Sequence, residues 1–135
     1  MQRLLYISKS KIKDADVSAL IAQIIAGSEK RNSFLDVTGA LIFTGAHFAQ
    51  VLEGSQKAIN ELMISVNNDA RHEAISVVDR SFITERQFSR WAMAYQGPSQ
   101  FVSRHVTRLF YTTPGAEQKR ATHWLTQLAR EFLRP

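Results

Sequence analysis

The sequence predicts an α+β fold, with a sheet that carries two helices on one face. Short apolar runs bounded by polar or glycine residues are typical of buried strands. Two longer segments have apolar residues recurring every three or four positions, which is typical of amphipathic helices. The length of 135 residues fits a single domain.

The N-terminal part predicts a strand followed by a helix. Residues 3–8 form an apolar run, Arg-Leu-Leu-Tyr-Ile-Ser, that indicates a buried strand. Asp14 or Asp16 can then cap a helix. Its apolar positions recur at helical spacing: Val17, Leu20, Ile21, Ile24 and Ile25.

Gly27-Ser28 weakens the pattern of this helix, whose end is expected near Lys30 and Arg31. The basic residues Lys30 and Arg31 suit the negative end of the helix dipole. Asn32 is therefore expected just past the helix, and by itself it is interpreted as a C-cap or turn residue.

A hairpin and a second helix follow. The apolar runs 39–44 and 47–53 meet across Gly45-Ala46, and glycine in the first turn position predicts a type II′ turn. Ser55 is a suitable N-cap for the next helix. That helix has apolar residues on one face: Ala58, Ile59, Leu62, Met63 and Val66.

Two more strands and two amphipathic stretches complete the pattern. Strands are expected within 74–83 and over 90–95, and after Gly97-Pro98 the stretches 101–110 and 121–132 have helical spacing. The order β-α-β-β-α-β is that of a ferredoxin-like sandwich, here with an extra strand. Both early helices are expected on one sheet face, with the two C-terminal helices covering the other.

Composition excludes several classes of protein. A hydrophobic content of 44% and a charged content of 21% are ordinary for a globular domain and unlike a disordered one. No apolar run approaches the roughly 18 residues that a membrane helix needs. The first residues lead straight into a strand pattern without a signal peptide, so we expect a cytoplasmic protein.

The residue types also argue against a metalloenzyme. There is no cysteine, which removes disulfides, thiolate metal sites and cysteine nucleophiles. The four histidines are scattered at 47, 72, 105 and 123, without the spacing of a metal motif.

The net charge of +5 is unevenly distributed. Residues 1–96 carry 11 basic and 10 acidic side chains, whereas residues 97–135 carry six basic and two acidic ones. The basic character therefore belongs to the C-terminal segment.

The strand patterns place two polar side chains among apolar ones. Gln50 lies between Phe48 and Leu52 on one strand face, and Tyr6 lies on the buried first strand. A buried amide costs free energy unless its oxygen and NH2 group find partners, and a tyrosine hydroxyl could serve. Tyr6 and Gln50 are thus a candidate buried polar pair; the alternative is a core tyrosine and a solvated glutamine.

Other positions have both ordinary and functional interpretations. Trp91 and Met93 share one face of the last strand, where such residues usually belong to the core. In Asp69-Ala70-Arg71-His72, the Arg and His could contact a phosphate or could belong to a simple helix-to-strand loop.

Taken together, these positions closely resemble the BLUF family of blue-light sensors over residues 1–96. The matching positions occur in order and at compatible spacing: Tyr6, Asn32, Thr38-Gly39, Phe48-Ala49-Gln50, Leu52-Glu53-Gly54, Asp69-Ala70-Arg71-His72 and Arg86-Gln87-Phe88-Ser89-Arg90-Trp91-Ala92-Met93. Ala49 is a departure, since many members have a second phenylalanine there.

The resemblance implies a flavin held without a covalent bond between the two early helices, FAD in the first instance, with FMN or riboflavin as substitutes. Gln50 would bridge the Tyr6 hydroxyl and the flavin, and Asn32 would hydrogen-bond the flavin's carbonyl side. The remaining residues implied at the cofactor are Ile24, Ile25, Lys30, Phe48, Leu52, Arg71, His72 and Met93.

The resemblance also implies a mechanism. Light would drive an electron and a proton from Tyr6 by way of Gln50, and the rearranged hydrogen bonds would red-shift the flavin absorption. Trp91 or Met93, whichever points inward, would pass the change to the last strand. No enzymatic activity is expected.

The same resemblance implies a division of labour along the chain. Residues 1–96 would be the sensor, and residues 97–135 an extension for output or for formation of a homo-oligomer. The signal would pass to an unidentified protein partner, for which the basic C-terminal segment suggests an acidic surface. No membrane is implied as a partner.

Two alternatives use the same fold. A nucleic-acid-binding module is suggested by the net charge, but it would need exposed aromatics interleaved with Lys and Arg on the sheet. An acylphosphatase-like enzyme would need an arginine-rich phosphate loop beside a water-positioning asparagine. Asn32 and Arg71 are poorly grouped for that task.

Overall fold

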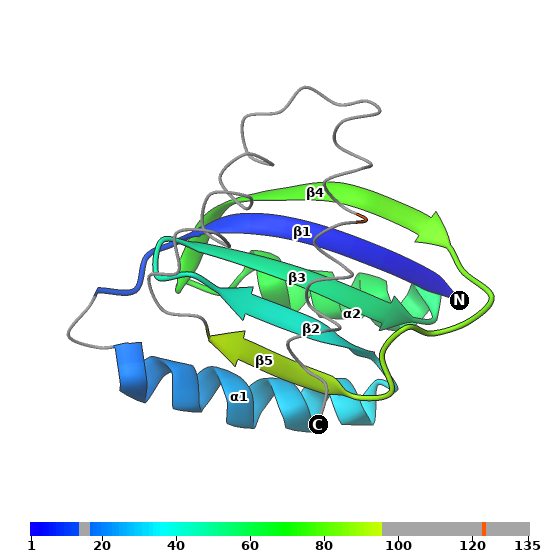
Figure 1. Ribbon diagram of the computed structural model, residues 1–135, viewed down its shortest axis with the longest axis horizontal. Coiled ribbons are helices and arrows are strands. Elements are labelled where there is room, and N and C mark those ends of the chain that lie inside the picture. The colour runs from blue at the N-terminus through cyan, green and yellow to red at the C-terminus, as the bar shows by residue number, and fades with distance from the viewer. Residues whose placement is uncertain (14–16, 96–122, 124–135) are drawn as a thin grey trace.

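A five-stranded sheet with two helices packed on one of its faces forms the part of the chain that the computed structural model describes (Figure 1). The described residues are 1–13, 17–95 and 123, without the side chains of 18 and 92–95. The elements are β1 (Gln2–Ser10), α1 (Val17–Phe34), β2 (Thr38–Phe43), β3 (His47–Gly54), α2 (Gln56–Asn67), β4 (His72–Phe82) and β5 (Trp91–Tyr95).

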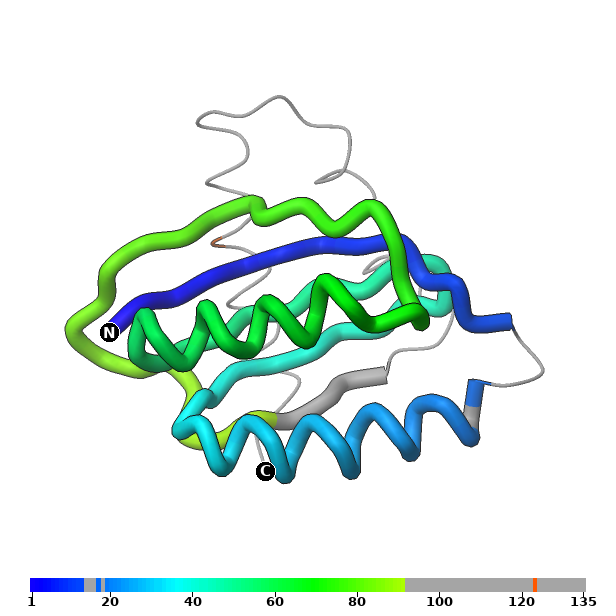
Figure 2. The backbone as a smooth tube through the Cα atoms, turned by 180° about the vertical axis from the view of Figure 1, so that it is seen from behind, coloured from blue at the N-terminus to red at the C-terminus, as the bar shows by residue number. Residues whose placement is uncertain are grey.

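The strand order is β4-β1-β3-β2-β5. The first four strands are paired antiparallel, and β5 is added parallel to β2. In Figure 2, seen from behind, α1 and α2 lie side by side against the same face of the sheet. This arrangement confirms the predicted ferredoxin-like fold with an extra strand.

The core between the sheet and the helices is apolar. Its members come from every element except β4: they include Leu4, Ile24, Phe43, Leu52, Ile59, Leu62 and Trp91. The opposite face of the sheet also holds buried side chains, among them Leu5, Ile7, Ile42 and Val51. The predicted cover for that face, 101–110 and 121–132, lies outside the described residues except for position 123.

Helix α1 corrects one prediction, because it continues past Arg31 and ends at Phe34. A glycine inside a helix costs only about 1 kcal/mol. Burial of Ile24, Ser28 and Asn32, spaced four residues apart on one side of the helix, favours the longer helix. Asn32 therefore lies in the last turn of α1 and is not a residue beyond it.

The end of α1 is a Schellman motif. The Val37 N–H donates to the Asn32 carbonyl at 2.8 Å and the Asp36 N–H donates to the Ser33 carbonyl at 3.2 Å. Asp36 has the positive φ of 54° that this motif requires at the position after the cap. The motif turns the chain sharply into β2.

The hairpin and the second helix follow the predictions closely. Gly45 has φ +93°, as a two-residue turn with glycine first requires, and the His47 N–H donates to the Thr44 hydroxyl at 3.1 Å. Ser55 caps α2 and its side chain accepts from the Ala58 N–H at 3.1 Å.

Two strand positions have special backbone. Gly39 has no room for a side chain, since an added Cβ would overlap the carbonyl oxygen of Val51 on β3. Strand β4 begins two residues earlier than predicted, and an irregularity opposite Ser8 leaves Ala74 with φ 54°. This irregularity brings His72 beside Ser8.

Candidate functional site

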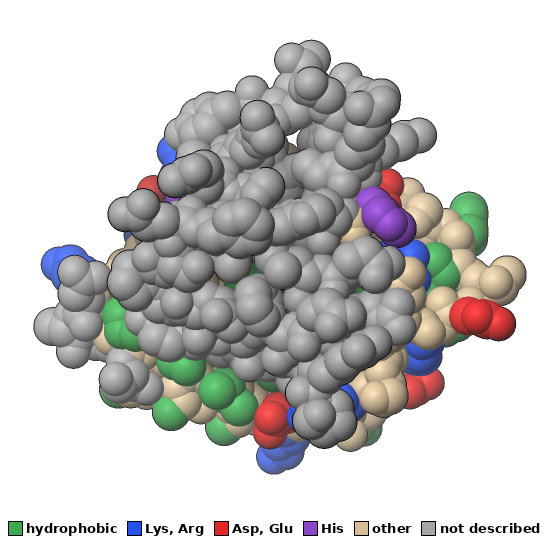
Figure 3. Space-filling model, viewed as in Figure 1, with side chains coloured by type: hydrophobic (Ala, Val, Ile, Leu, Met, Phe, Trp, Pro, Cys, Tyr) green, Lys and Arg blue, Asp and Glu red, His purple; other side chains and the backbone are tan. Residues whose placement is uncertain are grey.

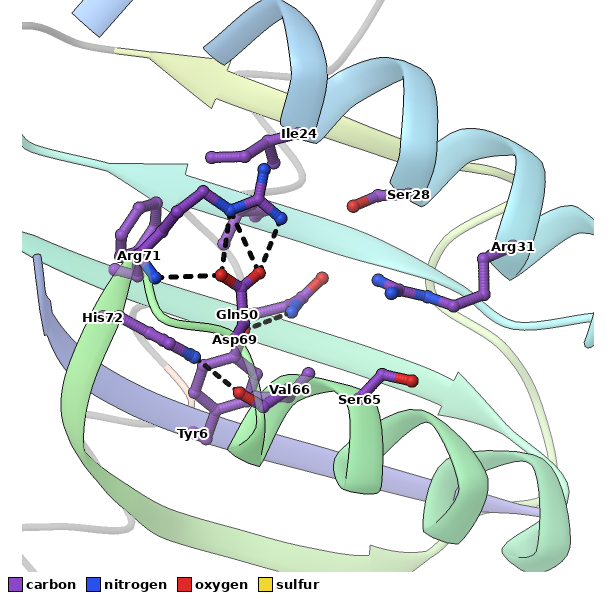
Figure 4. Close-up of a pocket in the computed structure, with 12 residues that line it drawn as sticks. Tyr6, Ile24, Ser28, Arg31, Gln50, Ser65, Val66, Asp69, Arg71 and His72 are labelled. Carbon is purple, nitrogen blue, oxygen red and sulfur yellow. Dashed lines mark hydrogen bonds and ion pairs between the residues drawn. The ribbon is translucent and has the colours of Figure 1, made fainter. Parts of the chain in front are cut away.

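A cavity with about 420 Å³ of empty space, part of it open to solvent, lies between α1 and α2 (Figure 4). Helix α1 provides one side, α2 and the following loop provide the other, and the sheet forms the floor. The lining residues are Tyr6, Ile24, Ser28, Arg31, Leu41, Phe48, Gln50, Ser65, Val66, Asp69, Arg71 and His72.

A chain of three buried side chains connects the floor of this cavity to β5. The Trp91 Nε1–H donates to Gln50 Oε1 at 2.8 Å, and Gln50 Nε2 donates to the Tyr6 hydroxyl at 2.5 Å. Tyr6 and Gln50 are direct partners in the register of β1 and β3. Because an indole can only donate, its bond determines which end of the Gln50 amide is the oxygen. The predicted pair of Tyr6 and Gln50 is confirmed, and Trp91 joins it.

The surroundings keep the Tyr6 phenol protonated. Burial raises its pKa well above the usual value; the hydrogen bond from Gln50 opposes this and the negative charge of Asp69 adds to it. A neutral phenol is thus maintained across the physiological pH range.

Asp69 and Arg71 form an ion pair on the cavity wall. Arg71 Nη2 lies 2.6 Å from Asp69 Oδ2, and Arg71 Nε donates to Asp69 Oδ1 at 2.9 Å. Burial alone would raise the pKa of the Asp69 carboxyl, but the hydrogen bonds and charge of Arg71 outweigh it and hold that pKa below its ordinary value. The same pairing raises the pKa of Arg71. The wall therefore carries two opposite charges that largely offset each other.

His72 is occupied by protein partners at both ring nitrogens. Nε2 lies 2.7 Å from the Val66 carbonyl oxygen, and Nδ1 lies 2.7 Å from the Ser8 hydroxyl. Because a carbonyl can only accept, Nε2 carries a proton. The ring also stands edge-on to Tyr6 and Phe48, with centroids 6.1 and 5.9 Å away. Only the ring surface remains for a ligand.

Two polar groups near the helix end lack partners among the described residues. The buried Asn32 amide has no hydrogen bond at either Nδ2 or Oδ1, and the buried Arg31 Nε has none. Figure 4 shows the Arg31 guanidinium pointing into the cavity. Asn32 lines an adjoining hollow together with Thr38, Arg90 and Trp91. Unpaired buried amide groups are rare in folded proteins, and they indicate a polar ligand.

The structure brings together six of the residues that the resemblance placed at a cofactor: Tyr6, Ile24, Phe48, Gln50, Arg71 and His72 all line the cavity. Ile25 is one position around the helix from Ile24 and is only half-buried, and Lys30 is exposed. Leu52 is fully buried in the core on the same sheet face and does not line the cavity. The side chain of Met93 is outside the described residues. For all of these, contact with a cofactor stays a prediction.

Sequence reasoning did not place six of the lining residues at the cavity: Ser28, Arg31, Leu41, Ser65, Val66 and Asp69. Asp69 was recognised only as part of the motif 69–72. A signal existed on α1, because Ser28 and Arg31 follow Ile24 at spacings of four and seven on one helix face. Val66 was counted as ordinary core. No periodic signal indicates Ser65, since only the position of α2 beside α1 brings it to the cavity.

Comparison with known proteins identifies this arrangement. The family model described as "Sensors of blue-light using FAD", BLUF, matches residues 1–94. This chain belongs to the BLUF family. It is a flavin-binding sensor of blue light, as the resemblance implied.

Relatives of the BLUF chain include larger proteins. It is 31% identical over 87 residues to the blue light- and temperature-regulated antirepressor BluF of Escherichia coli (strain K12), covering 64% of this chain and 22% of that protein. It is 29% identical over 93 residues to a photoactivated adenylate cyclase subunit beta of Euglena longa, covering 69% of this chain and 11% of that one. The chain thus spans less than a quarter of either relative.

Solved structures agree along most of the BLUF chain. The dark-state structure of BlrB, a BLUF protein, is 32% identical with a TM-score of 0.72, covering 91% of this chain and 92% of that one. The photo-activated state of BlsA is 20% identical with a TM-score of 0.78, covering 96% and 94%, and this likeness shows the shared fold.

The residues of the cavity fit a flavin. A flavin needs an apolar slot for its rings and fixed polar groups at its heteroatom edge. Ile24, Leu41 and Phe48 supply apolar surface in the cavity, and the unpaired Asn32 amide supplies both a donor and an acceptor in the hollow that it lines with Trp91. The BLUF chain therefore has the chemistry that its family's cofactor requires.

Other classes receive no support. Among the described residues, no group of three His, Cys, Asp or Glu could hold a metal ion, and no helix is long and apolar enough to cross a membrane. In Figure 3, acidic and basic side chains both occur around the described rim, without a large patch of one sign in that view. The family assignment replaces the two alternatives, a nucleic-acid-binding module and an acylphosphatase-like enzyme.

Proposed function

We propose that this BLUF chain binds FAD without a covalent bond between α1 and α2, and that light acts by reversing the hydrogen bonds of Gln50. The observation that carries the proposal is the directed series of donors from Trp91 to Gln50 to Tyr6. Trp91 can only donate, Gln50 donates with one end of its amide and accepts with the other, and Tyr6 can do either. Reversal of the Gln50 amide would therefore change its hydrogen bonds to both Tyr6 and Trp91.

The proposed contacts follow from the lining of the cavity. Ile24 on α1 and Val66 on α2 would lie on either side of the rings, and Asn32 would complete its hydrogen bonds on the polar edge. Ile25, Lys30, Leu52 and Met93 belong to the same proposal through the family resemblance. They would form a wider shell around the cofactor.

The phosphate-bearing end of FAD needs cationic or polar groups. Arg71 stands at the wall but is shared with Asp69, and His72 offers only its ring. Arg71 would therefore contact the cofactor with the donors that Asp69 leaves free. FMN or riboflavin could occupy the same slot, since the ring contacts do not involve the phosphate.

A bound flavin would supply the absorption of blue light and an acceptor for one electron. Tyr6 is the group of this chain that can respond. Its buried phenol is neutral, so loss of an electron would be accompanied by loss of its proton to a neighbouring acceptor. Gln50 donates its Nε2–H to the Tyr6 oxygen at 2.5 Å, so its carbonyl oxygen could accept the phenol proton and pass it to the flavin only once the amide has reversed.

Reversal of the Gln50 amide would have a definite consequence at β5. Its oxygen would then accept from the Tyr6 hydroxyl, and its NH2 group would face Trp91 Nε1–H. Two donors cannot bond each other, so the Trp91 indole would have to leave. Light would in this way be converted into a displacement at the start of β5.

The output is part of the same proposal. Residues 1–96 would be the sensor and residues 97–135 an output or oligomerisation segment without enzymatic activity of its own, in a cytoplasmic protein. The large relatives named above, an antirepressor and a cyclase subunit, illustrate partners or attached domains of different kinds. A homo-oligomer and an acidic protein partner remain the proposed recipients of the signal.

Extraction and spectroscopy test this proposal. The pigment of the purified protein should be released by denaturation and run as FAD in chromatography. Blue light should shift the flavin band reversibly to the red in the wild type and in Gln56→Leu, an exposed glutamine on α2 that serves as the control. Tyr6→Phe and Gln50→Leu should abolish the shift, and a full shift in Gln50→Leu would overturn the mechanism.

A further inference from the structure

We propose that Glu53 is a positioning residue of the light switch: it fixes the segment that leads into β5 and thereby holds the Trp91 indole on Gln50. The inference rests on the proposed importance of the Trp91–Gln50 bond. It assigns a role to a buried charge that does not line the flavin cavity.

The Glu53 carboxylate is fully buried and is surrounded by donors. Arg3 Nη2 and Nε donate to Glu53 Oε2 at 2.7 and 3.0 Å. The Phe88 N–H donates to Oε1 at 2.8 Å, and the Gln87 N–H lies 2.9 and 3.1 Å from the two oxygens. One side chain on β3 therefore binds β1 and two successive main-chain groups of the β4–β5 connection.

Other residues of the β4–β5 connection form hydrogen bonds close to Glu53. Arg86 donates to the Thr38 hydroxyl at 2.8 Å, to the Glu53 carbonyl at 3.0 Å and to the Asp36 carbonyl at 2.9 Å. The Gly39 N–H donates to the Arg90 carbonyl at 3.1 Å. Trp91 follows directly, so its backbone position is set by these anchors.

Glu53 acts from the other side of the sheet. It lies three residues after Gln50 on β3, and side chains at that spacing point to opposite faces of a strand. Glu53 therefore reaches Trp91 only through the main chain of the connection. The Trp91 side chain lies on the Gln50 side of the sheet, where its Nε1–H donates to Gln50 Oε1 at 2.8 Å.

A buried carboxylate at this position is not explained by stability alone, because the removal of a charge from water costs free energy. Burial of an ion pair gains little over a well-packed apolar side chain. An apolar side chain could not, however, accept the Gln87 and Phe88 N–H groups. The specific contribution of the carboxylate is thus the attachment of these two groups, three and four residues before Trp91.

The test is made in the dark, on the flavin-loaded full chain. A Trp124→Phe background leaves one indole, that of Trp91, whose N–H is followed by NMR. Glu53→Leu fills the position but removes both acceptor oxygens, and hydrogen exchange of the Trp91 indole should become at least tenfold faster. Glu61→Gln, an exposed position on α2, should leave it unchanged.

A purely structural role predicts a different result. In that case Glu53→Leu would lower the thermal midpoint without altering the exchange or chemical shift of the Trp91 indole, and the proposal would be overturned. Arg3→Gln is the second comparison: it removes the ion pair but keeps both main-chain bonds, so it should lower stability and leave the indole protected.

A measurement on the unchanged chain covers the case in which Glu53→Leu does not fold. The Gln87 and Phe88 amide protons should exchange slowly although they lie outside any strand or helix. Exchange at the rate of an open loop would refute the attachment. These dark measurements do not depend on a light response, so they would stand if the Gln50 photochemistry failed, and an absent red shift would count only against the proposed function.

Discussion

Strand β3 carries two buried polar side chains that face opposite sides of the sheet, Gln50 and Glu53. The Gln50 side is neutral, and its amide both donates and accepts. The Glu53 side is charged, and its carboxylate only accepts. An amide can exchange its two ends at no cost in charge, whereas a carboxylate has no second arrangement to adopt. The Gln50 network is therefore suited to a switch between two hydrogen-bond arrangements, and the Glu53 network is suited to holding the β4–β5 connection in place.

Removal of the holding group should have the largest effect. Glu53→Ala leaves Arg3 and the Gln87 and Phe88 N–H groups without their acceptor, and loss of one partner of a buried ion pair costs about 3–5 kcal/mol. Urea unfolding of the flavin-loaded chain should show a loss in this range. A loss below about 1 kcal/mol would mean that water replaces the carboxylate easily and would weaken the distinction between the two networks.

Removal of the switching group should cost less. Gln50→Leu leaves the Trp91 indole N–H without its acceptor, but Tyr6 keeps its hydroxyl and the leucine fills the space, so a loss of about 1–3 kcal/mol is expected. The same unfolding experiment measures it. The comparison would fail if Gln50→Leu proved more destabilising than Glu53→Ala.

A second carboxylate, Asp69, lies on the Gln50 side and provides a pH test. Its pKa is lower in the folded protein, so its contribution to the free energy of unfolding is complete above the unfolded pKa of about 4 and is lost as the pH falls through the folded value. The difference in unfolding free energy between the wild type and Asp69→Asn should therefore be largest at pH 6 and should shrink as the pH falls below about 4. A difference that does not shrink would assign the effect to packing and not to charge.

The smallest effect concerns the backbone beside the Gln50 network. Ala74 has φ 54° in the irregularity of β4 that places His72 against Ser8. Glycine adopts this conformation without strain, so Ala74→Gly should raise stability by about 0.5–1 kcal/mol. Differential scanning calorimetry would detect the rise in midpoint. Ala58→Gly, in the first turn of α2, should instead lower it, which makes a matched control.

Much of this architecture was predictable because local chemistry encodes it. Alternation along the strands places Tyr6 and Gln50 on the side that packs against the helices, and Ser55 signals the start of α2 through its hydroxyl. The end of α1 was predicted too early because Lys30 and Arg31 are typical of the last turn of a helix and Asn32 is typical of the residue after it. Burial of Ser28 and Asn32 against the rest of the fold decides the matter instead.

The sequence by itself determined the order of the elements, the faces of the strands and, through the motif residues, membership of a flavin-binding family. Only the tertiary structure decided that the Trp91 indole donates to Gln50 and that Glu53 binds the residues before β5. The reason is that periodicity reports which way a side chain faces, whereas a hydrogen bond between residues 35 or 41 positions apart depends on how distant segments meet across the sheet.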